Sequence, residues 1–138
     1  MPPNQYVNMK KTLTIIAGLM LAVVLTSADK NPKVMTKEKG TYVVNTTEIA
    51  KDVEGYNGPT PLKVYIKNGK IEKIEYLSND ETPKYWNAVV KHMEGKWDGK
   101  TVKEAKTMKV DGRTGATYSS DAVKENVKRA LDYYEKNK

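Results

Sequence analysis

The segment from Asp111 to Ser120, DGRTGATYSS, has the residue types that a phosphate site needs. Glycine and alanine let the backbone approach a ligand closely, and the segment leads into a predicted helix. Free amides and the positive end of the dipole at a helix N-terminus favour a phosphate, and Arg113 adds a cation. The residues alone leave two interpretations open: an anion site, or a polar turn followed by a helix N-cap.

Other reactive side chains are scarce in the 138 residues. The chain has no cysteine and one histidine, His92, which excludes disulfides, thiolate nucleophiles, iron–sulfur clusters and metal sites that need two imidazoles. Ser119 or Ser120 with His92 does not suggest a hydrolase, because there is no GxSxG motif. We therefore predict no catalytic residue and no metal ligand, and we expect His92 at the surface near a helix end.

The formal net charge of +7 comes from 24 lysines and arginines against 17 acidic residues. Only Arg113 and Arg129 are arginines, and the lysines are spread through segments that also carry Asp and Glu. Base recognition depends on arginine forks, and backbone binding depends on clustered charge. We therefore expect no nucleic acid partner and interpret the lysines as solvated surface.

The N-terminal residues have the pattern of a targeting segment. A pair of lysines precedes an uncharged apolar run, Thr12–Leu25, and small residues follow it. This pattern predicts a signal peptide over residues 1–28 or, as the alternative, an uncleaved N-terminal anchor and membrane association. We expect export to the periplasm or cell envelope, a flexible lead-in over residues 29–39, and one domain over residues 40–138.

Strands are predicted in the first part of that domain. Residues 41–44 are strand formers, and residues 62–67 alternate apolar and polar side chains, as in a strand with one buried face. Asn68-Gly69 suits a two-residue hairpin turn. The return strand, residues 70–77, places its two isoleucines on opposite faces unless a β-bulge intervenes.

Helices are predicted in the second part. The first starts at Thr82-Pro83 and stops near Gly95, and a short helical segment follows at residues 101–108. The last helix has Ser119 or Ser120 as its N-cap. Its apolar stripe consists of Val123, Val127, Ala130, Leu131 and Tyr134. The order of elements predicts an α+β fold, a small antiparallel sheet with a hairpin packed against two main helices.

The motif Asp-x-x-Thr-Gly-Ala-Thr at Asp111–Thr117 resembles the flavin-attachment signature of the FMN-binding domain family. That family includes the flavin-bearing subunits of sodium-pumping NADH:quinone reductases and of Rnf-type complexes, and small exported flavoproteins. Four further segments are similar to the family in the expected order: Gly55–Pro59, Asn68–Ile71, Glu81–Pro83 and Ser119–Val123. The resemblance extends from about Gly40 to Tyr134.

In this family a separate flavin transferase uses FAD and Mg²⁺ to esterify FMN, through its phosphate, to the last threonine of the motif. The resemblance therefore implies a covalent FMN on Thr117. A separate enzyme suits the chain, because a threonine hydroxyl is a poor nucleophile without an adjacent base. The cofactor-binding residues that we expect are Thr117, Asp111, Gly112, Thr114, Gly115, Ala116, Ser119, Tyr56, Gly58 and Thr82, with Tyr56 as a stacking ring.

The resemblance also implies a role. It indicates an exported electron carrier rather than an enzyme with its own substrate, with a flavin transferase and redox donor and acceptor proteins of the envelope as partners. Two alternatives stay open. One is a flavin-free envelope binding or structural module with the same fold, and the other is a flavin reductase subunit that also binds an acceptor molecule.

Overall fold

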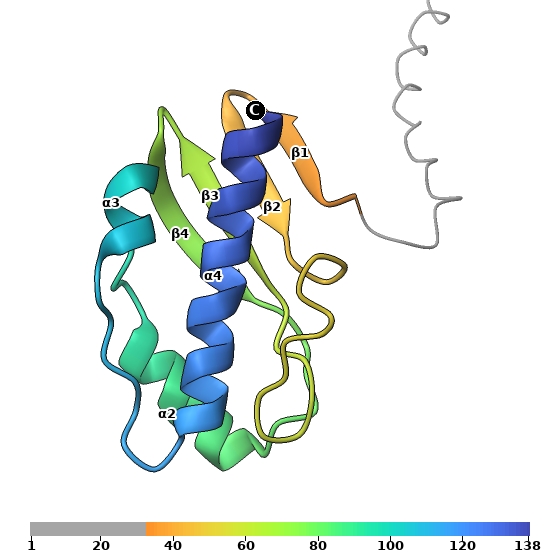
Figure 1. Cartoon of the computed structure of the whole chain (residues 1–138), viewed down its shortest axis with the longest axis vertical. Coiled ribbons are helices and arrows are strands. Elements are labelled where there is room, and N and C mark those ends of the chain that lie inside the picture. The colour runs from red at the N-terminus through yellow and green to blue at the C-terminus, as the bar shows by residue number, and fades with distance from the viewer. Residues whose placement is uncertain (1–32) are drawn as a thin grey trace, which may run out of the picture. The chain divides into compact units, whose positions relative to one another are not determined.

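The computed structural model describes residues 33–138. The expected signal peptide or anchor, residues 1–28, lies outside the described residues. The described residues form a four-stranded antiparallel sheet with helices packed against it, so the expected α+β class is confirmed (Figure 1). Within this part of the chain, no helix combines the length and the apolar character that a membrane crossing requires.

The strands pair in chain order, each antiparallel to the next. Helix α4 lies across one face of this sheet (Figure 1). The strands are β1 (Met35–Glu38), β2 (Thr41–Asn45), β3 (Leu62–Lys67) and β4 (Lys70–Tyr76), and the helices are α2 (Pro83–Met93), α3 (Val102–Thr107) and α4 (Thr117–Asn137).

Residues 35–38 form an edge strand, so the prediction of a flexible lead-in over residues 29–39 is wrong there. The whole of β1 pairs with β2. The connecting residues Lys39 and Gly40 both have positive φ, 52° and 85°, as a type I′ turn requires. The polar sequence conceals this strand because an edge strand needs backbone pairing on one side only, and lysines there discourage pairing with other chains.

The hairpin of β3 and β4 follows the prediction. Asn68 and Gly69 form its turn with φ of 53° and 75°. Glu72 has no cross-strand partner, so a β-bulge does intervene in the return strand. Because of it, Ile71 is buried in the core and Ile74 packs against the same core, although their spacing alone places them on opposite faces.

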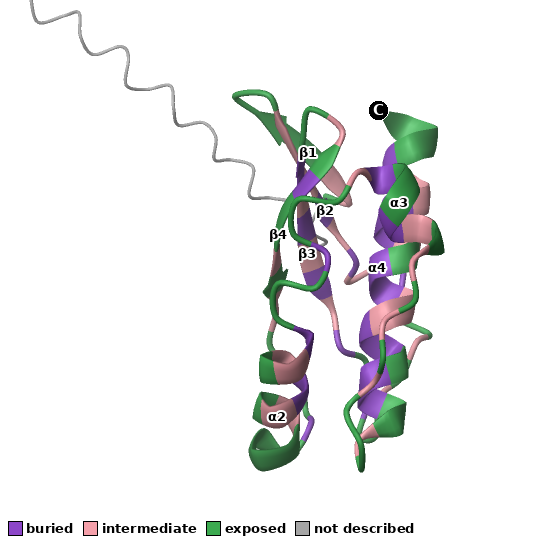
Figure 2. Cartoon of the chain, turned by 90° about the vertical axis from the view of Figure 1, so that its left-hand side faces the viewer, coloured by how far each residue is buried: buried purple, intermediate pink, exposed green. Residues whose placement is uncertain are grey.

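The core lies between the sheet and α4, where buried side chains of both elements meet (Figure 2). Tyr134 of α4 packs edge to face against Tyr42 of β2, with ring centroids 5.2 Å apart. Such an aromatic pair contributes about 0.5–1.5 kcal/mol. Burial of each large aliphatic side chain contributes about 1.5–3 kcal/mol, so the aliphatic core holds α4 on the sheet more strongly than this pair does. As predicted, the alternating side chains of β3 and the stripe of α4 are buried: Leu62, Val64, Ile66, Val123, Val127, Ala130, Leu131 and Tyr134.

The two shorter helices also agree with the prediction. Helix α2 starts with Pro83 and ends at Met93, and Gly95 follows with a φ of 77°. Helix α3 starts with a capping box, in which the Thr101 hydroxyl accepts from the Glu104 amide at 3.1 Å while the Glu104 carboxylate accepts from the Thr101 amide at 2.9 Å.

Helix α4 starts earlier than predicted. It begins at Thr117 with Ala116 at the N-cap position, so the prediction that Ser119 or Ser120 caps it is wrong. Both serines are buried inside the helix. The Ser119 hydroxyl donates to Glu81, and the Ser120 hydroxyl accepts from an amide of the preceding loop at 2.9 Å. These tertiary contacts use the hydroxyls, and the first amides of α4 are left without a side-chain cap.

Candidate functional site

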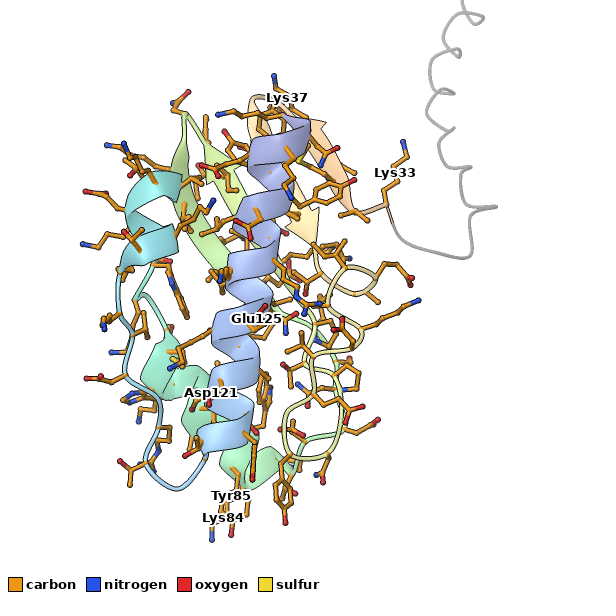
Figure 3. The ribbon with its side chains drawn as sticks, in the orientation of Figure 1. Lys33, Lys37, Lys84, Tyr85, Asp121 and Glu125 are labelled. Atoms are coloured by element: carbon orange, nitrogen blue, oxygen red, sulfur yellow. The ribbon has the colours of Figure 1, made fainter. Side chains whose placement is uncertain are left out.

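A cavity of about 540 Å³ opens between the loop before β3, the start of α2 and the start of α4. This volume is in the range of sites for small molecules and cofactors. Figure 3 shows Tyr85 at the end of the molecule where α2 begins. The cavity is lined by Tyr56, Glu81, Thr82, Tyr85, Gly115, Ala116, Thr117, Tyr118 and Ser119.

The carboxylate of Glu81 joins the three segments that form the cavity. One of its oxygens accepts from the Tyr56 amide at 2.9 Å, and the other accepts from the Asn57 amide at 2.5 Å. The Ser119 hydroxyl of α4 donates to the first of these oxygens. Because Glu81 itself lies two residues before α2, next to the N-cap residue Thr82, its carboxylate connects all three walls.

Two glycines shape the loop that carries Tyr56. A Cβ on Gly55 would lie 2.5 Å from a carboxylate oxygen of Glu81, which is too close for any side chain. Gly58 is buried and has a φ of 148°, a conformation that L-residues rarely adopt, and its carbonyl accepts from the Gly55 amide at 2.7 Å. The loop can therefore close tightly around Glu81 only with glycine at both positions.

Three exposed tyrosines surround the cavity. Tyr56, Tyr85 and Tyr118 are 76%, 58% and 69% exposed, and among residues 33–138 they are the exposed large hydrophobic side chains. The rings of Tyr56 and Tyr118 lie 6.4 Å apart between centroids at an angle of 37°. Gathered exposed aromatic surface of this kind is typical of a binding site, and it suits a flat aromatic ligand.

The start of α4 supplies a polar end to the cavity. Thr117 is exposed as the first residue of the helix, and Gly115 before it has a φ of 86°. The first turn of α4 carries no acidic residue. Its uncapped amides and the helix dipole therefore favour an anion next to the Thr117 hydroxyl.

The structure brings together most of the residues predicted for the site. Gly58 shapes a wall without lining the cavity, whereas Asp111, Gly112 and Thr114 lie in the loop that leads to α4 and do not line it. The predicted residues that do line it are Tyr56, Thr82, Gly115, Ala116, Thr117 and Ser119.

The loop before α4 is attached to its neighbours by contacts of its own. The Nε2 atom of His92, in α2, lies 3.0 Å from the carbonyl oxygen of Asp111. The Arg113 amide donates to the Ser120 hydroxyl at 2.9 Å, and a Cβ on Gly112 would lie 3.0 Å from the Cβ of Ser120. These contacts hold the loop against the start of α4, and they make Gly112 a packing position.

Sequence reasoning missed Glu81, Tyr85 and Tyr118 as lining residues. Glu81 belongs to a segment that resembles the family, but the hydrogen-bond partners of its carboxylate are 24 to 38 residues away along the chain. Tyr85 and Tyr118 are each close in sequence to a predicted site residue, Thr82 or Thr117. A solvent-exposed tyrosine next to such a residue is the signal that could have identified them.

The described residues form a small α+β domain with a cavity whose lining suits an aromatic, anionic ligand. The family model described as "FMN-binding domain" matches residues 55–132 of the chain. The chain therefore belongs to the FMN-binding domain family, and the predicted resemblance is confirmed. The matched region starts in the Tyr56 loop and continues through most of α4, so it contains every wall of the cavity.

The residues of the cavity fit FMN, the cofactor that the family indicates. Exposed tyrosine rings suit the isoalloxazine, and the amides at the start of α4 suit the phosphate. When bound, the flavin supplies redox chemistry that the side chains of this protein lack.

Proposed function

We propose that this protein carries FMN esterified through its phosphate to Thr117 and that it transfers electrons between partners in the cell envelope. The observation that carries the proposal is the position of Thr117 in a member of the FMN-binding domain family. It is the exposed first residue of α4, at the cavity, and the last threonine of the attachment motif.

The surroundings of Thr117 support a phosphoester there. A phosphate on its hydroxyl would lie beside the uncapped amides of α4 and the backbone of Gly115 and Ala116. These groups favour a phosphate because they are donors at the positive end of the helix dipole. The isoalloxazine of the same cofactor then has Tyr56, Tyr85 and Tyr118 within the same cavity.

A separate flavin transferase makes the bond in this proposal. The side-chain hydrogen bonds at the start of α4 involve Ser119 and Ser120, and within residues 33–138 none joins a side chain to the Thr117 hydroxyl, so no general base is held against it there. In the transfer, the Thr117 oxygen bonds to the FMN phosphorus of FAD while the pyrophosphate P–O bond breaks. AMP leaves, the hydroxyl proton is released, and Mg²⁺ assists in the transferase.

The role as a carrier outside the cytoplasm rests on the chemistry of the chain and on its N-terminal pattern. Because the chain has no cysteine and one histidine, the flavin is the credible redox centre of the protein. Residues 1–28 have the pattern of a signal peptide or anchor, and a covalent bond keeps the cofactor from being lost by dilution after export. Donor and acceptor proteins of the envelope are the proposed partners.

The intact mass of the protein after co-expression with a flavin transferase tests this proposal. Wild type should gain one FMN less one water, and Thr117→Ala should show no increment. Thr107→Ala is the matched control, because Thr107 is an exposed threonine at the end of α3, outside the motif and the cavity. It should be modified like wild type. A colourless wild-type protein of unchanged mass would favour the flavin-free module instead.

Steady-state kinetics of the flavinylated protein separate the carrier from the reductase alternative. A carrier should exchange electrons with partners without saturable turnover of a small acceptor. Saturable reduction of a small acceptor would favour a flavin reductase subunit.

A further inference from the structure

Glu81 has an unusual environment for an acidic side chain. It is 7% exposed, and among residues 33–138 it is the one charged residue that is buried. Within this part of the chain it forms no ion pair. The three hydrogen-bond partners of its carboxylate are all donors: two backbone amides and the Ser119 hydroxyl. This pattern matches an ionised carboxylate, which only accepts.

A buried charge without a counter-ion is costly, even when hydrogen bonds compensate for part of the lost hydration. A glutamine could supply the oxygen that accepts from Tyr56 and Ser119, but its NH₂ group could not accept from the Asn57 amide, so the charge comes with one additional hydrogen bond. The carboxylate is also part of the cavity wall. Its charge would therefore act on a ligand in the cavity from a buried position, where water screens it less than it screens an exposed carboxylate.

We propose that Glu81 is a positioning residue that spaces the cavity walls and lowers the reduction potential of the flavin by its negative charge. The inference rests on the proposed function. Two electrons from a reductant and one proton convert neutral oxidised isoalloxazine into a reduced form with one negative charge. A fixed carboxylate next to the cavity opposes that added charge, so the oxidised flavin is favoured.

The substitution Glu81→Gln removes the charge and keeps the shape of the side chain. In flavinylated protein it should raise the midpoint potential, measured by dithionite titration with redox dyes. We expect the ratio of reduced to oxidised flavin at a fixed potential to rise roughly tenfold, or about 30 mV for a two-electron couple. The matched control is Asp80→Asn, which removes the same charge from the adjacent, exposed position and should change the ratio much less.

Two further variants separate charge from spacing. Glu81→Asp keeps the charge but shortens the side chain, so the potential should stay close to that of wild type while the walls loosen. Ser119→Ala removes a donor that partly screens the carboxylate, so the potential should move in the opposite direction, below wild type. Ser119→Ala also keeps the inference testable if Glu81→Gln does not fold.

Amide hydrogen exchange of the full-length protein without flavin gives a second readout. The Tyr56 and Asn57 amides should be protected in wild type and Asp80→Asn, and Glu81→Asp should speed their exchange at least tenfold. Equal exchange in all variants would overturn the spacing role. Flavinylated wild type and Glu81→Gln with equal potentials would overturn the charge role and leave the proposed function intact. If the wild-type protein takes up no flavin, both the charge role and the proposed function are overturned.

Discussion

A methyl group at position 55 probes the contact that organises the cavity. The Cβ of an alanine there would lie 2.5 Å from the Glu81 carboxylate oxygen, 3.0 Å from its carboxyl carbon and 3.1 Å from the Thr60 methyl. Since Cβ atoms are not found this close to other atoms, the Glu81 side chain must move away from the amides of Tyr56 and Asn57.

The size of the effect follows from opposing contributions. Overpacking of a close-packed site costs about 1–3 kcal/mol. Gly55 does not have a positive φ, so alanine fits its backbone. Alanine also reduces the conformational freedom of the unfolded chain, which stabilises the folded protein by roughly 0.4–1 kcal/mol. We therefore expect Gly55→Ala to lower the free energy of unfolding by about 1–2 kcal/mol, measured by urea unfolding of the full-length protein.

A double-mutant cycle assigns this loss to Glu81. In a Glu81→Ala background the carboxylate is absent and only the milder contact with Thr60 remains, so Gly55→Ala should be close to neutral or slightly stabilising. The coupling energy should then be about 1–2 kcal/mol, well above the roughly 0.3–0.5 kcal/mol expected for independent sites. Additive effects of the two substitutions would refute the claim that Glu81 holds the loop at this spacing.

Further predictions concern the rest of the domain. Asn126→Ala should cost about 2–3 kcal/mol in urea unfolding, because buried Asn126 accepts from the Thr46 hydroxyl at 2.5 Å and that hydroxyl would lose a partner. The hydrogen bond from the Arg129 guanidinium lowers the pKa of Asp52. The pair should therefore stabilise the fold at pH values above the usual pKa of an aspartate, and this stabilisation should be lost as the pH falls through the lowered pKa. Asp52→Asn should remove this part of the acid dependence of unfolding. Burial raises the pKa of Tyr76 to about 12, and the nearby charges of Asp98 and Glu94 add to the effect. An absorbance titration should therefore show Tyr76 ionising at a higher pH than an exposed tyrosine. Its stabilising contribution should be complete below pH 10 and decline as pH approaches 12, and Tyr76→Phe should abolish that decline.

Much of the fold could be predicted because its signals are local. The alternation in β3, the Asn68-Gly69 turn and the apolar stripe of α4 each depend on neighbouring residues, and the structure confirms them. Strand β1 could not be predicted from its own side chains, because they are mostly polar and exposed and do not alternate between buried and exposed as those of β3 do. The sequence does not predict the start of α4 correctly, because Ser119 and Ser120 are typical N-cap residues but their hydroxyls bond to Glu81 and to the preceding loop.

One part of the site could likewise be predicted from the sequence, and the other part could not. The start of α4, with Thr117 and Gly115, is contiguous in sequence, so its chemistry can be predicted from the motif. The other walls come from loops that Glu81 brings together over 24 to 38 residues, and no local pattern specifies those hydrogen bonds. The burial of Glu81 and its place in the cavity wall follow only from the folded arrangement.

Tandem mass spectrometry of one tryptic peptide tests the central claim most directly. Cleavage after Arg113 and Lys124 releases the peptide Thr114–Lys124, TGATYSSDAVK, which contains Thr117 and several other hydroxyls. After co-expression with a flavin transferase, we predict a peptide that carries FMN with its fragment ions assigning the phosphoester to Thr117. An unmodified peptide, or FMN on another residue of it, would contradict the account.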